Sequence, residues 1–156
     1  EQYIFKSIDI LSRISSNDKN PAVLAFLCGG CGYPAADEAG VLSKGRPEYQ
    51  YPPCVIPLQV ECGGSIDTQF ILKAIERGFD GVALTVCRDG HCHHIVGNTD
   101  MERRISVFRE VLRSRNIDAE RMRIIKVSPH EGELFSSEIN SFVKDLTERR
   151  HAWVKN

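Results

Sequence analysis

The stretch Val82-Ala-Leu-Thr-Val-Cys-Arg-Asp-Gly-His-Cys-His-His94 joins an apolar run to a loop rich in side chains that can bind metals. Its first five residues are small or branched and almost wholly apolar, which is typical of a strand covered on both faces. Two cysteines and three histidines then follow within eight residues. Strands of this kind belong to parallel sheets, so the stretch predicts an α/β fold with potential ligands at the end of a strand.

Three further apolar runs of this kind alternate with segments of helical periodicity. The predicted strands are 22–27, 55–60, 82–86 and 122–127. The segments with the apolar spacing of amphipathic helices are 35–42, 70–75, 105–112 and 134–146. The alternation predicts a doubly wound, three-layer α/β domain of the flavodoxin or Rossmann kind, with a four-stranded parallel sheet.

Local signals predict several helix ends. Thr99 and Ser128 each stand three residues before a glutamate, which predicts a capping box at the start of two helices. Gly78 predicts the end of a helix that follows Asp67.

Length, charge and hydropathy indicate one domain without nucleic-acid or membrane partners. The 156 residues suffice for one well-packed core and are too few for two typical ones. A polar turn separates residues 1–20, expected to be an N-terminal arm or linker, from a domain at 21–150 and a tail at 151–156. The formal net charge of −1 argues against a nucleic-acid partner. No apolar run has the length of a membrane span, so we expect a cytoplasmic protein.

Five of the six cysteines fall at the carboxyl ends of predicted strands. They are Cys28 and Cys31 after the first strand, Cys62 after the second, and Cys87 and Cys92 after the third. Since these strand ends lie at one edge of a parallel sheet, the five thiols are expected to meet there. Adjacent glycines allow backbone N–H groups to approach the sulfurs. Cys54 stands at a strand entrance and is expected to be an ordinary small apolar residue.

Several kinds of site use cysteines at this spacing. The pattern Cys28-x-x-Cys31 occurs in structural zinc sites, dithiol oxidoreductases and iron–sulfur proteins. A structural-zinc binding module and a dithiol oxidoreductase therefore stay open as alternatives. The dithiol interpretation leaves Cys62, Cys87 and Cys92 without a role.

The other polar residues of the quoted stretch have weaker claims to chemistry. Histidines in loops are commonly exposed, and we expect this of His91, His93 and His94 rather than metal ligation. Arg88 and Asp89 are expected to shape the loop or its charge. The glycine-rich segments lack both the phosphate-loop lysine and the dinucleotide fingerprint, which argues against nucleotide binding.

The order of these motifs resembles that of a known family. The motifs are Cys28-x-x-Cys31-x-Tyr-x-x-Ala-Asp37-x-Ala-Gly40, Tyr51-Pro-Pro, Cys62-x-Gly-x-x-Asp67, Phe70-x-Leu-x-Ala-x-x-x-Gly78-x-Asp-Gly81, Cys87-x-x-Gly-x-Cys92-His93, Gly97-Asn98 and Glu131-Gly132. From about residue 22 to 148 the chain resembles the delta subunit family of methyl-viologen-reducing hydrogenase. It departs from that family at Gly30, where the family has a large residue, at Ser65, where it has an arginine, and at 89–91, where it has Pro-Gly-Asp.

The resemblance implies an electron-transfer subunit that turns over no substrate itself. Such a subunit carries one [2Fe–2S] cluster and relays single electrons between a hydrogenase or formate dehydrogenase and the flavin-bearing A subunit of heterodisulfide reductase. That A subunit bifurcates electrons in methanogenesis and related anaerobic metabolism. The family cysteines fall on the five named above, and we prefer Cys31, Cys62, Cys87 and Cys92 as ligands, with Cys28 as the competing ligand. The arm at 1–20 lies outside the resemblance, and its apolar residues are expected either to contact a partner or to cover the core.

Overall fold

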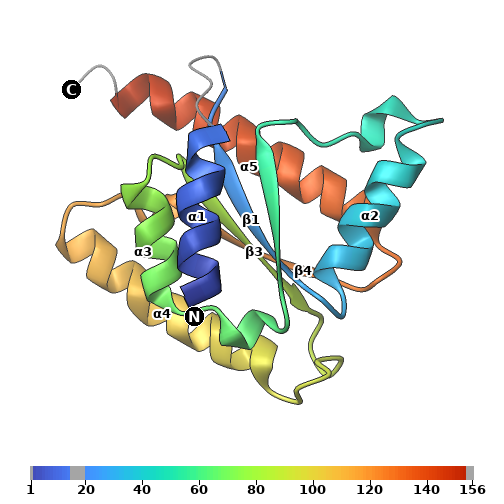
Figure 1. Ribbon diagram of the computed structural model, residues 1–156, viewed down its shortest axis with the longest axis horizontal. Coiled ribbons are helices and arrows are strands. Elements are labelled where there is room, and N and C mark those ends of the chain that lie inside the picture. Colours follow the sequence, from blue (N-terminus) through green and yellow to red (C-terminus); the bar gives the residue numbers. More distant parts are fainter. Residues whose placement is uncertain (1, 15–19, 154–156) are drawn as a thin grey trace.

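Four parallel strands form a sheet in the order β2-β1-β3-β4, as the computed structural model of the chain shows (Figure 1). The strands are β1 (Val23–Cys28), β2 (Val55–Val60), β3 (Gly81–Cys87) and β4 (Met122–Val127). The predicted strands are therefore confirmed to within one residue at each end. The central β1 and β3 are buried throughout, whereas the edge strands β2 and β4 are partly exposed. Burial on both faces thus holds for the two central strands.

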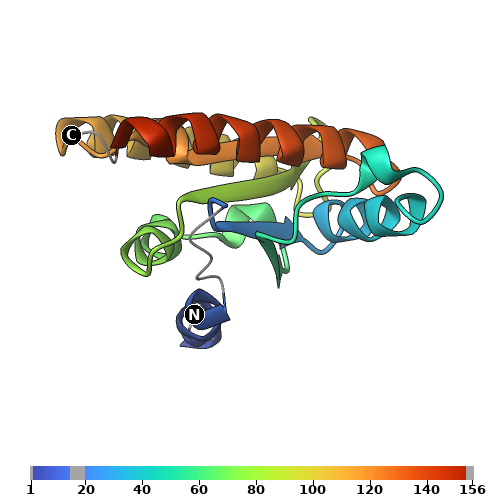
Figure 2. The same ribbon diagram turned by 90° about the horizontal axis from the view of Figure 1, so that it is seen from above.

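Helices cover both faces of this sheet in the described part of the chain, residues 2–14 and 20–153. They are α1 (Gln2–Ile14), α2 (Gly32–Leu42), α3 (Thr68–Glu76), α4 (Gly97–Ser114) and α5 (Gly132–Trp153), with short 3-10 turns η1 (Pro47–Tyr49), η2 (Gly63–Ser65) and η3 (Ala119–Arg121). Helices α1, α3 and α4 pack on one face and α2 and α5 on the other, and Figure 2 shows α1 and α5 on opposite sides of the sheet. The predicted doubly wound three-layer fold is confirmed.

Some sequence predictions lie outside the described residues. These are most of the polar turn before residue 20 and the end of the tail at 151–156. Among the helices that the structure describes, none is both long and apolar enough to cross a membrane.

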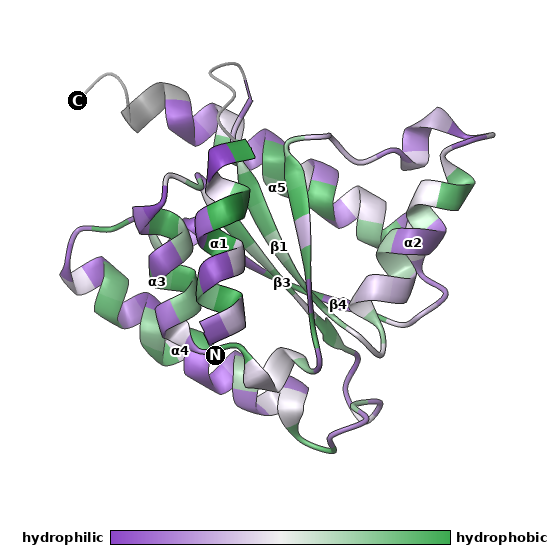
Figure 3. Cartoon of the chain, in the orientation of Figure 1, coloured by the Kyte–Doolittle hydropathy of each residue, from purple (hydrophilic) through white to green (hydrophobic). Residues whose placement is uncertain are grey.

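Alternation along the central strands supplies both halves of the core. Leu24 and Phe26 of β1 face α1, α3 and α4, whereas Ala25 and Leu27 face α2 and α5. Figure 3 shows the strands as apolar and the helices with polar residues on part of their surface. Because both strand faces are covered by helices, the sequence of a central strand is an unbroken apolar run.

The two predicted capping boxes do not mark helix starts, and these predictions are wrong. Helix α4 begins two residues before Thr99, and α5 begins four residues after Ser128. Glu131 does accept a hydrogen bond from the N–H of Ser128, with 2.7 Å between the heavy atoms. The same carboxylate also binds Arg88, so the contact belongs to a loop rather than to a helix cap.

Helix α3 starts and ends as predicted. The carboxylate of Asp67 accepts a hydrogen bond from the N–H of Gln69 at 2.8 Å, which makes Asp67 its N-cap. Gly78, with a φ of +93°, follows its last turn. That backbone conformation is open to glycine and rarely adopted by other residues.

Helix α1, which lies in the predicted arm, packs against α3. Ile8 is fully buried in the core shared with α3 and α4. The ring of Phe5 meets that of Phe70 edge to face, with 5.0 Å between centroids. Asp9 pairs with Arg77 of the turn after α3 at 2.8 Å. Residues of α1 are thus part of the core on this side of the sheet.

Replacing Ile8 by alanine tests this packing. Removal of a fully buried Ile side chain is expected to lower the free energy of unfolding by about 2–5 kcal/mol. Ile10, on the same helix, is 58% exposed, so Ile10→Ala is the matched control and is expected to change it by less than about 0.5 kcal/mol. Urea unfolding measures the free energy of unfolding of both variants and of the parent chain. Equal and small effects of the two substitutions would contradict the packing of α1 on the core.

Candidate metal centre

A crevice lies between the carboxyl ends of β1 and β3. Here the chain switches from adding strands on one side of β1 to adding them on the other. The chain passes from β1 to β2 on one side, and β3 lies on the other side of β1. In doubly wound folds this crevice binds ligands. Cys28 is the last residue of β1 and Cys87 is the last of β3, and their sulfur atoms lie 3.9 Å apart.

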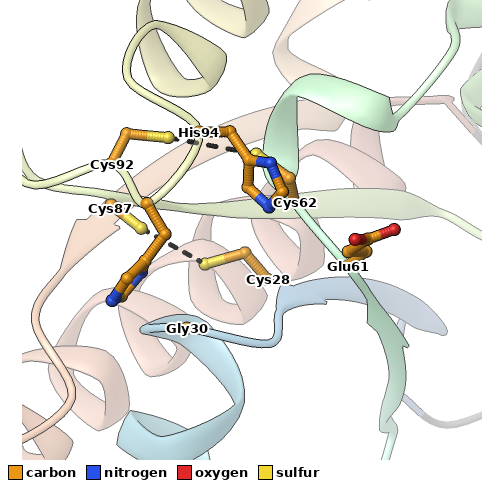
Figure 4. Close-up of a pocket in the computed structure, with 8 residues that line it drawn as sticks. Cys28, Gly30, Glu61, Cys62, Cys87, Cys92 and His94 are labelled. Atoms are coloured by element: carbon orange, nitrogen blue, oxygen red, sulfur yellow. Dashed lines mark hydrogen bonds between the residues drawn. The ribbon is translucent and has the colours of Figure 1, made fainter.

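A second pair of thiols lies at the same crevice (Figure 4). The sulfur atoms of Cys62 and Cys92 are also 3.9 Å apart. Both pairs line one cavity of about 200 Å³, whose walls are Cys28, Gly30, Glu61, Cys62, Cys87, Cys92, His93 and His94. Cys28 and Cys87 end their strands, whereas Cys62 and Cys92 lie in the segments that follow β2 and β3. In Figure 4 the sulfurs of each pair point toward each other.

Cys31 adjoins the first pair without lining the cavity. Its sulfur lies within 4.8 Å of those of Cys28 and Cys87, and its residue is 2% exposed. It directly precedes α2. Of the two cysteines of the Cys-x-x-Cys pattern, Cys28 is therefore the one on the cavity wall. Both sulfurs nevertheless lie within 4.8 Å of that of Cys87.

All six cysteines lie in described residues and are free thiols. Cys54 is apart from the other five and packs, partly buried, against the core on the α2 and α5 side. Its prediction as an ordinary small apolar residue is confirmed.

Backbone N–H groups point at the sulfurs. The N–H of Gly32 donates to the sulfur of Cys28 at 3.2 Å, and the N–H of Gly64 donates to that of Cys62 at 3.3 Å. Gly32 and Gly64 thus confirm the prediction that glycines beside the cysteines let backbone N–H groups approach the sulfurs. Such bonds favour negative charge on sulfur, as in thiolates bound to metal.

Burial determines the ionisation of most of these thiols. Burial raises the pKa of Cys28, Cys31 and Cys62, and that of Cys87 to about 12. For Cys92, burial acts in the same direction, but backbone N–H donors outweigh it and lower its pKa. Thiols with raised pKa values are poor nucleophiles, and a bound metal cation deprotonates them. Apart from Cys92, whose pKa is lowered, these thiols therefore suit metal coordination better than nucleophilic chemistry.

Two glycines allow the loops around Cys62 and Cys92 to meet. A Cβ atom on Gly97 would lie 2.5 Å from the sulfur of Cys62 and 3.1 Å from that of Cys92. A Cβ atom on Gly64 would lie 2.7 Å from the Cα of Gly97. There is therefore no room for a side chain at position 97 while the sulfurs stay in place, nor at position 64 while the backbone of Gly97 stays in place.

Gly97→Ala is expected to displace the sulfurs of Cys62 and Cys92 and to reduce bound metal per chain severalfold after anaerobic reconstitution. The helix α2 offers a control, because a Cβ atom on Gly40 would meet no atom within 4 Å. Gly40→Ala should therefore bind as much metal as the parent chain. Metal analysis of the two variants tests this, and equal metal content would contradict the close packing described here.

An amide and an ion pair hold the loop that follows Cys87. The side chain of Asn98, which is 2% exposed, donates to the carbonyls of Cys87 and Arg88 at 3.2 and 3.1 Å. Arg88 binds both carboxylate oxygens of Glu131, at 2.6 and 2.8 Å, and thereby lowers the pKa of Glu131 to about 2. The prediction that Arg88 shapes the loop is confirmed. Sequence patterns assign Asn98 no role beyond its place in a motif, and Glu131 only the capping box with Ser128, because the partners found here are distant in sequence.

Two departures from the family pattern have close neighbours in space. A Cβ atom on Gly30 would lie 2.5 Å from the Nδ1 atom of His93, so the imidazole takes the room that a larger residue would need. Arg104 of α4 donates to the carbonyl of Gly64 at 3.1 Å, beside Ser65, where the family has an arginine. His93 and His94 are exposed, as predicted, and lie at the rim of the cavity.

Residues 23–148 match the sequence model of the family described as methyl-viologen-reducing hydrogenase, delta subunit. The chain belongs to this family. The iron-sulfur D subunit of the vhc F420-non-reducing hydrogenase of Methanococcus voltae is 39% identical over 120 residues, which are 77% of this chain and 80% of that relative. The iron-sulfur D subunit of the F420-non-reducing hydrogenase of Archaeoglobus profundus is 35% identical over 135 residues, 86% of this chain and 93% of the relative. Both relatives are thus named as iron–sulfur subunits, and the resemblance seen in the motifs is confirmed.

Other relatives contain a similar region within a much longer chain. The A subunit of the ferredoxin/F(420)H(2)-dependent CoB-CoM heterodisulfide reductase of Methanosarcina acetivorans is 35% identical over 148 residues, 92% of this chain. The A subunit of the ferredoxin:CoB-CoM heterodisulfide reductase of Methanosarcina mazei is 34% identical over the same length. This chain spans 18% of the length of each of these two relatives. In both, a region like this chain is covalently joined to the rest of an A subunit.

Proposed function

We propose that this chain is an electron-transfer subunit that carries one [2Fe–2S] cluster. In this proposal it relays single electrons between a hydrogenase or formate dehydrogenase and the flavin-bearing A subunit of a heterodisulfide reductase. The observation that carries the proposal is that four thiols form two pairs at the crevice, with 3.9 Å between the two sulfurs of each pair. The chain also belongs to a family with relatives named as iron–sulfur subunits.

The spacing within each pair fits two thiolates on one tetrahedral metal. With metal–sulfur bonds of about 2.3 Å, two such ligands lie about 3.8 Å apart. A [2Fe–2S] cluster takes two cysteines on each iron, and hence two pairs of this kind. We assign Cys28 and Cys87 to one iron and Cys62 and Cys92 to the other, with support from the cavity that these four line. Cys31 is then the adjoining fifth cysteine.

The chemistry that the cluster supplies when bound is the uptake and return of one electron. The residues around it exclude water and hold charge on sulfur. Burial covers Cys28 and Cys87, and the N–H groups of Gly32 and Gly64 donate to sulfur. Hydrogen bonds to the sulfurs and solvent exposure are among the features that set the reduction potential of such centres.

The partner proposal is supported by the two groups of relatives. Similar chains occur as separate subunits of hydrogenases, and a similar region occurs inside A subunits of heterodisulfide reductases. A domain that is separate in one system and joined to the A subunit in another is expected to work beside that subunit in both. This favours an electron path that connects the hydrogenase side and the A subunit through this chain.

A structural zinc site is the second candidate, and one observation favours it. The sulfurs of Cys28, Cys31 and Cys87 lie within 4.8 Å of one another, as three ligands of a zinc ion would. The dithiol alternative has less support. Cys28 and Cys31 are each 2% exposed and have raised pKa values, whereas a reactive dithiol needs an accessible thiolate.

Electron transfer to the proposed partner tests the function. The chain, reconstituted with iron and sulfide and reduced under anaerobic conditions, is mixed with an oxidised flavin-bearing heterodisulfide reductase A subunit. Bleaching of the flavin absorbance, in proportion to the reduced chain added, is the expected result. A Cys87→Ser chain treated in the same way is the control. A flavin that is bleached equally by both chains, or by neither, would contradict the proposed relay.

A further inference from the structure

Ile95, in the loop between Cys92 and α4, has a backbone conformation that its own side chain disfavours. Its φ is +62°, in the left-handed region that β-branched residues rarely adopt. The N–H of Val96 donates to the carbonyl of His94 at 2.7 Å and closes a γ-turn at Ile95. A γ-turn with positive φ is rare and strained. Glycine or asparagine would adopt this conformation with less strain.

The side chain of Ile95 has no compensating burial within the chain. It is 84% exposed, the highest value among the large apolar side chains that the structure describes, and the adjacent Val96 is 52% exposed. A strained turn therefore presents two branched apolar side chains to solvent. Strain of this kind persists mainly at functional sites, so the benefit of an isoleucine here is expected to come from a contact outside the chain.

These two side chains lie at the least covered edge of the metal centre. Of the five strand-end cysteines, Cys92 is the one that is not fully buried. The N–H of Ile95 donates to the carbonyl of Cys92 at 2.9 Å, which fixes the turn next to that ligand. His94, on the other side of the turn, lines the cavity. Because electron transfer slows steeply with distance, a partner's redox centre would come closest to the site where the chain covers it least.

The surface continues from this edge along α4. A hollow of about 430 Å³, lined by Val96 and Asp100 among others, adjoins the cavity wall at Cys62. A second hollow, of about 510 Å³, shares Asp100 and is lined by Val107 and Val111, which are 63% and 49% exposed. The two hollows thus follow α4 from Val96 to Val111, and charged side chains of Asp100, Arg103 and Arg104 lie among the exposed valines.

We propose that Ile95 and Val96 are the central contact through which this chain docks onto the flavin-bearing A subunit of a heterodisulfide reductase. The proposal rests on the proposed function. The A subunit is the chosen occupant because in two relatives a similar region is part of the same chain as the rest of an A subunit, which keeps the two parts close to each other. Apolar side chains at the centre of an interface, in pockets closed to water, contribute most of the binding free energy.

Two substitutions at residue 95 separate docking from folding. Ile95→Gly and Ile95→Asn both remove the apolar side chain, and both residues tolerate a positive φ. The control is Val41→Asn on α2, since Val41 is also branched and is 63% exposed, and valine and asparagine have similar helix propensities. The four chains, reconstituted with iron and sulfide, are compared for affinity to a purified A subunit by biolayer interferometry, for melting temperature, and for iron content and EPR spectrum.

The dissociation constant of both Ile95 variants is expected to rise at least about tenfold. Their iron content and EPR spectra should match the parent, their melting temperatures should be equal or higher, and Val41→Asn should bind as the parent does. Unchanged affinity of the Ile95 variants for an A subunit that the parent binds would overturn the docking proposal and leave the proposed function intact. A parent chain that binds a hydrogenase subunit or a second copy of itself, but no A subunit, would overturn the proposed partner and the docking proposal together.

Discussion

Cys87→Ser is expected to abolish the metal centre. Anaerobic reconstitution of the parent chain should give about two irons and two acid-labile sulfides per chain, and the variant should give close to none. The reason is the position of Cys87, whose sulfur is 3.9 Å from that of Cys28 and within 4.8 Å of that of Cys31. Each ligand set considered for this chain contains Cys87. Iron and sulfide analysis of the two chains is the measurement.

Cys54→Ser is the control for this substitution, because Cys54 packs against the core away from the other thiols. It should retain the iron and sulfide of the parent. A Cys87→Ser chain that keeps both irons, or a Cys54→Ser chain that loses them, would place the metal centre elsewhere.

The second large effect distinguishes the two cysteines that compete for one ligand position. Cys28→Ser is expected to lose iron and sulfide as completely as Cys87→Ser, whereas Cys31→Ser should keep about two of each. Cys28 lines the cavity beside Cys62, Cys87 and Cys92, and Cys31 does not. Metal analysis and the EPR spectrum of the reduced chains measure the difference.

The opposite outcomes have distinct meanings. A cluster that survives in Cys28→Ser and is lost in Cys31→Ser would restore the preference drawn from the sequence. Loss of a single zinc ion in both variants would favour the structural zinc site, which uses both of these cysteines with Cys87.

The strand ends and their cysteines were predictable because their signals are local. Unbroken apolar runs are required wherever helices cover both faces of a strand, and this holds for β1 and β3. The parallel order then brings the strand ends to one edge, so Cys28, Cys62 and Cys87 line the same cavity. The spacing Cys-x-x-Cys does not say which of its two sulfurs faces the cavity. That depends on the path of the chain after β1, which places Cys31 directly before α2 and leaves Cys28 on the cavity wall.

Other parts of the site depend on contacts between residues distant in sequence. Gly97 has its role because a side chain there would touch the sulfur of Cys62, which belongs to another loop. Arg104 reaches the carbonyl of Gly64 from α4. The buried Asn98 spans ten and eleven positions to hold the loop after Cys87. Spacing in a single sequence contains no signal for such contacts.

The same limit applies to α1. Its apolar residues were expected either to contact a partner or to cover the core, and the structure places Ile8 in the core while Ile10 is exposed. Helical periodicity predicts that one face is apolar. It does not predict that the helix packs on α3, which follows from the contact of Phe5 with Phe70.

The cluster itself is the central claim, and one measurement tests it most directly. The chain is purified without oxygen, its iron and acid-labile sulfide are determined per chain, and EPR spectra are recorded before and after reduction with dithionite. We expect about two irons and two sulfides, and a signal that is present only after reduction. Zinc without iron, or thiols that titrate freely with no metal bound, would contradict the [2Fe–2S] relay.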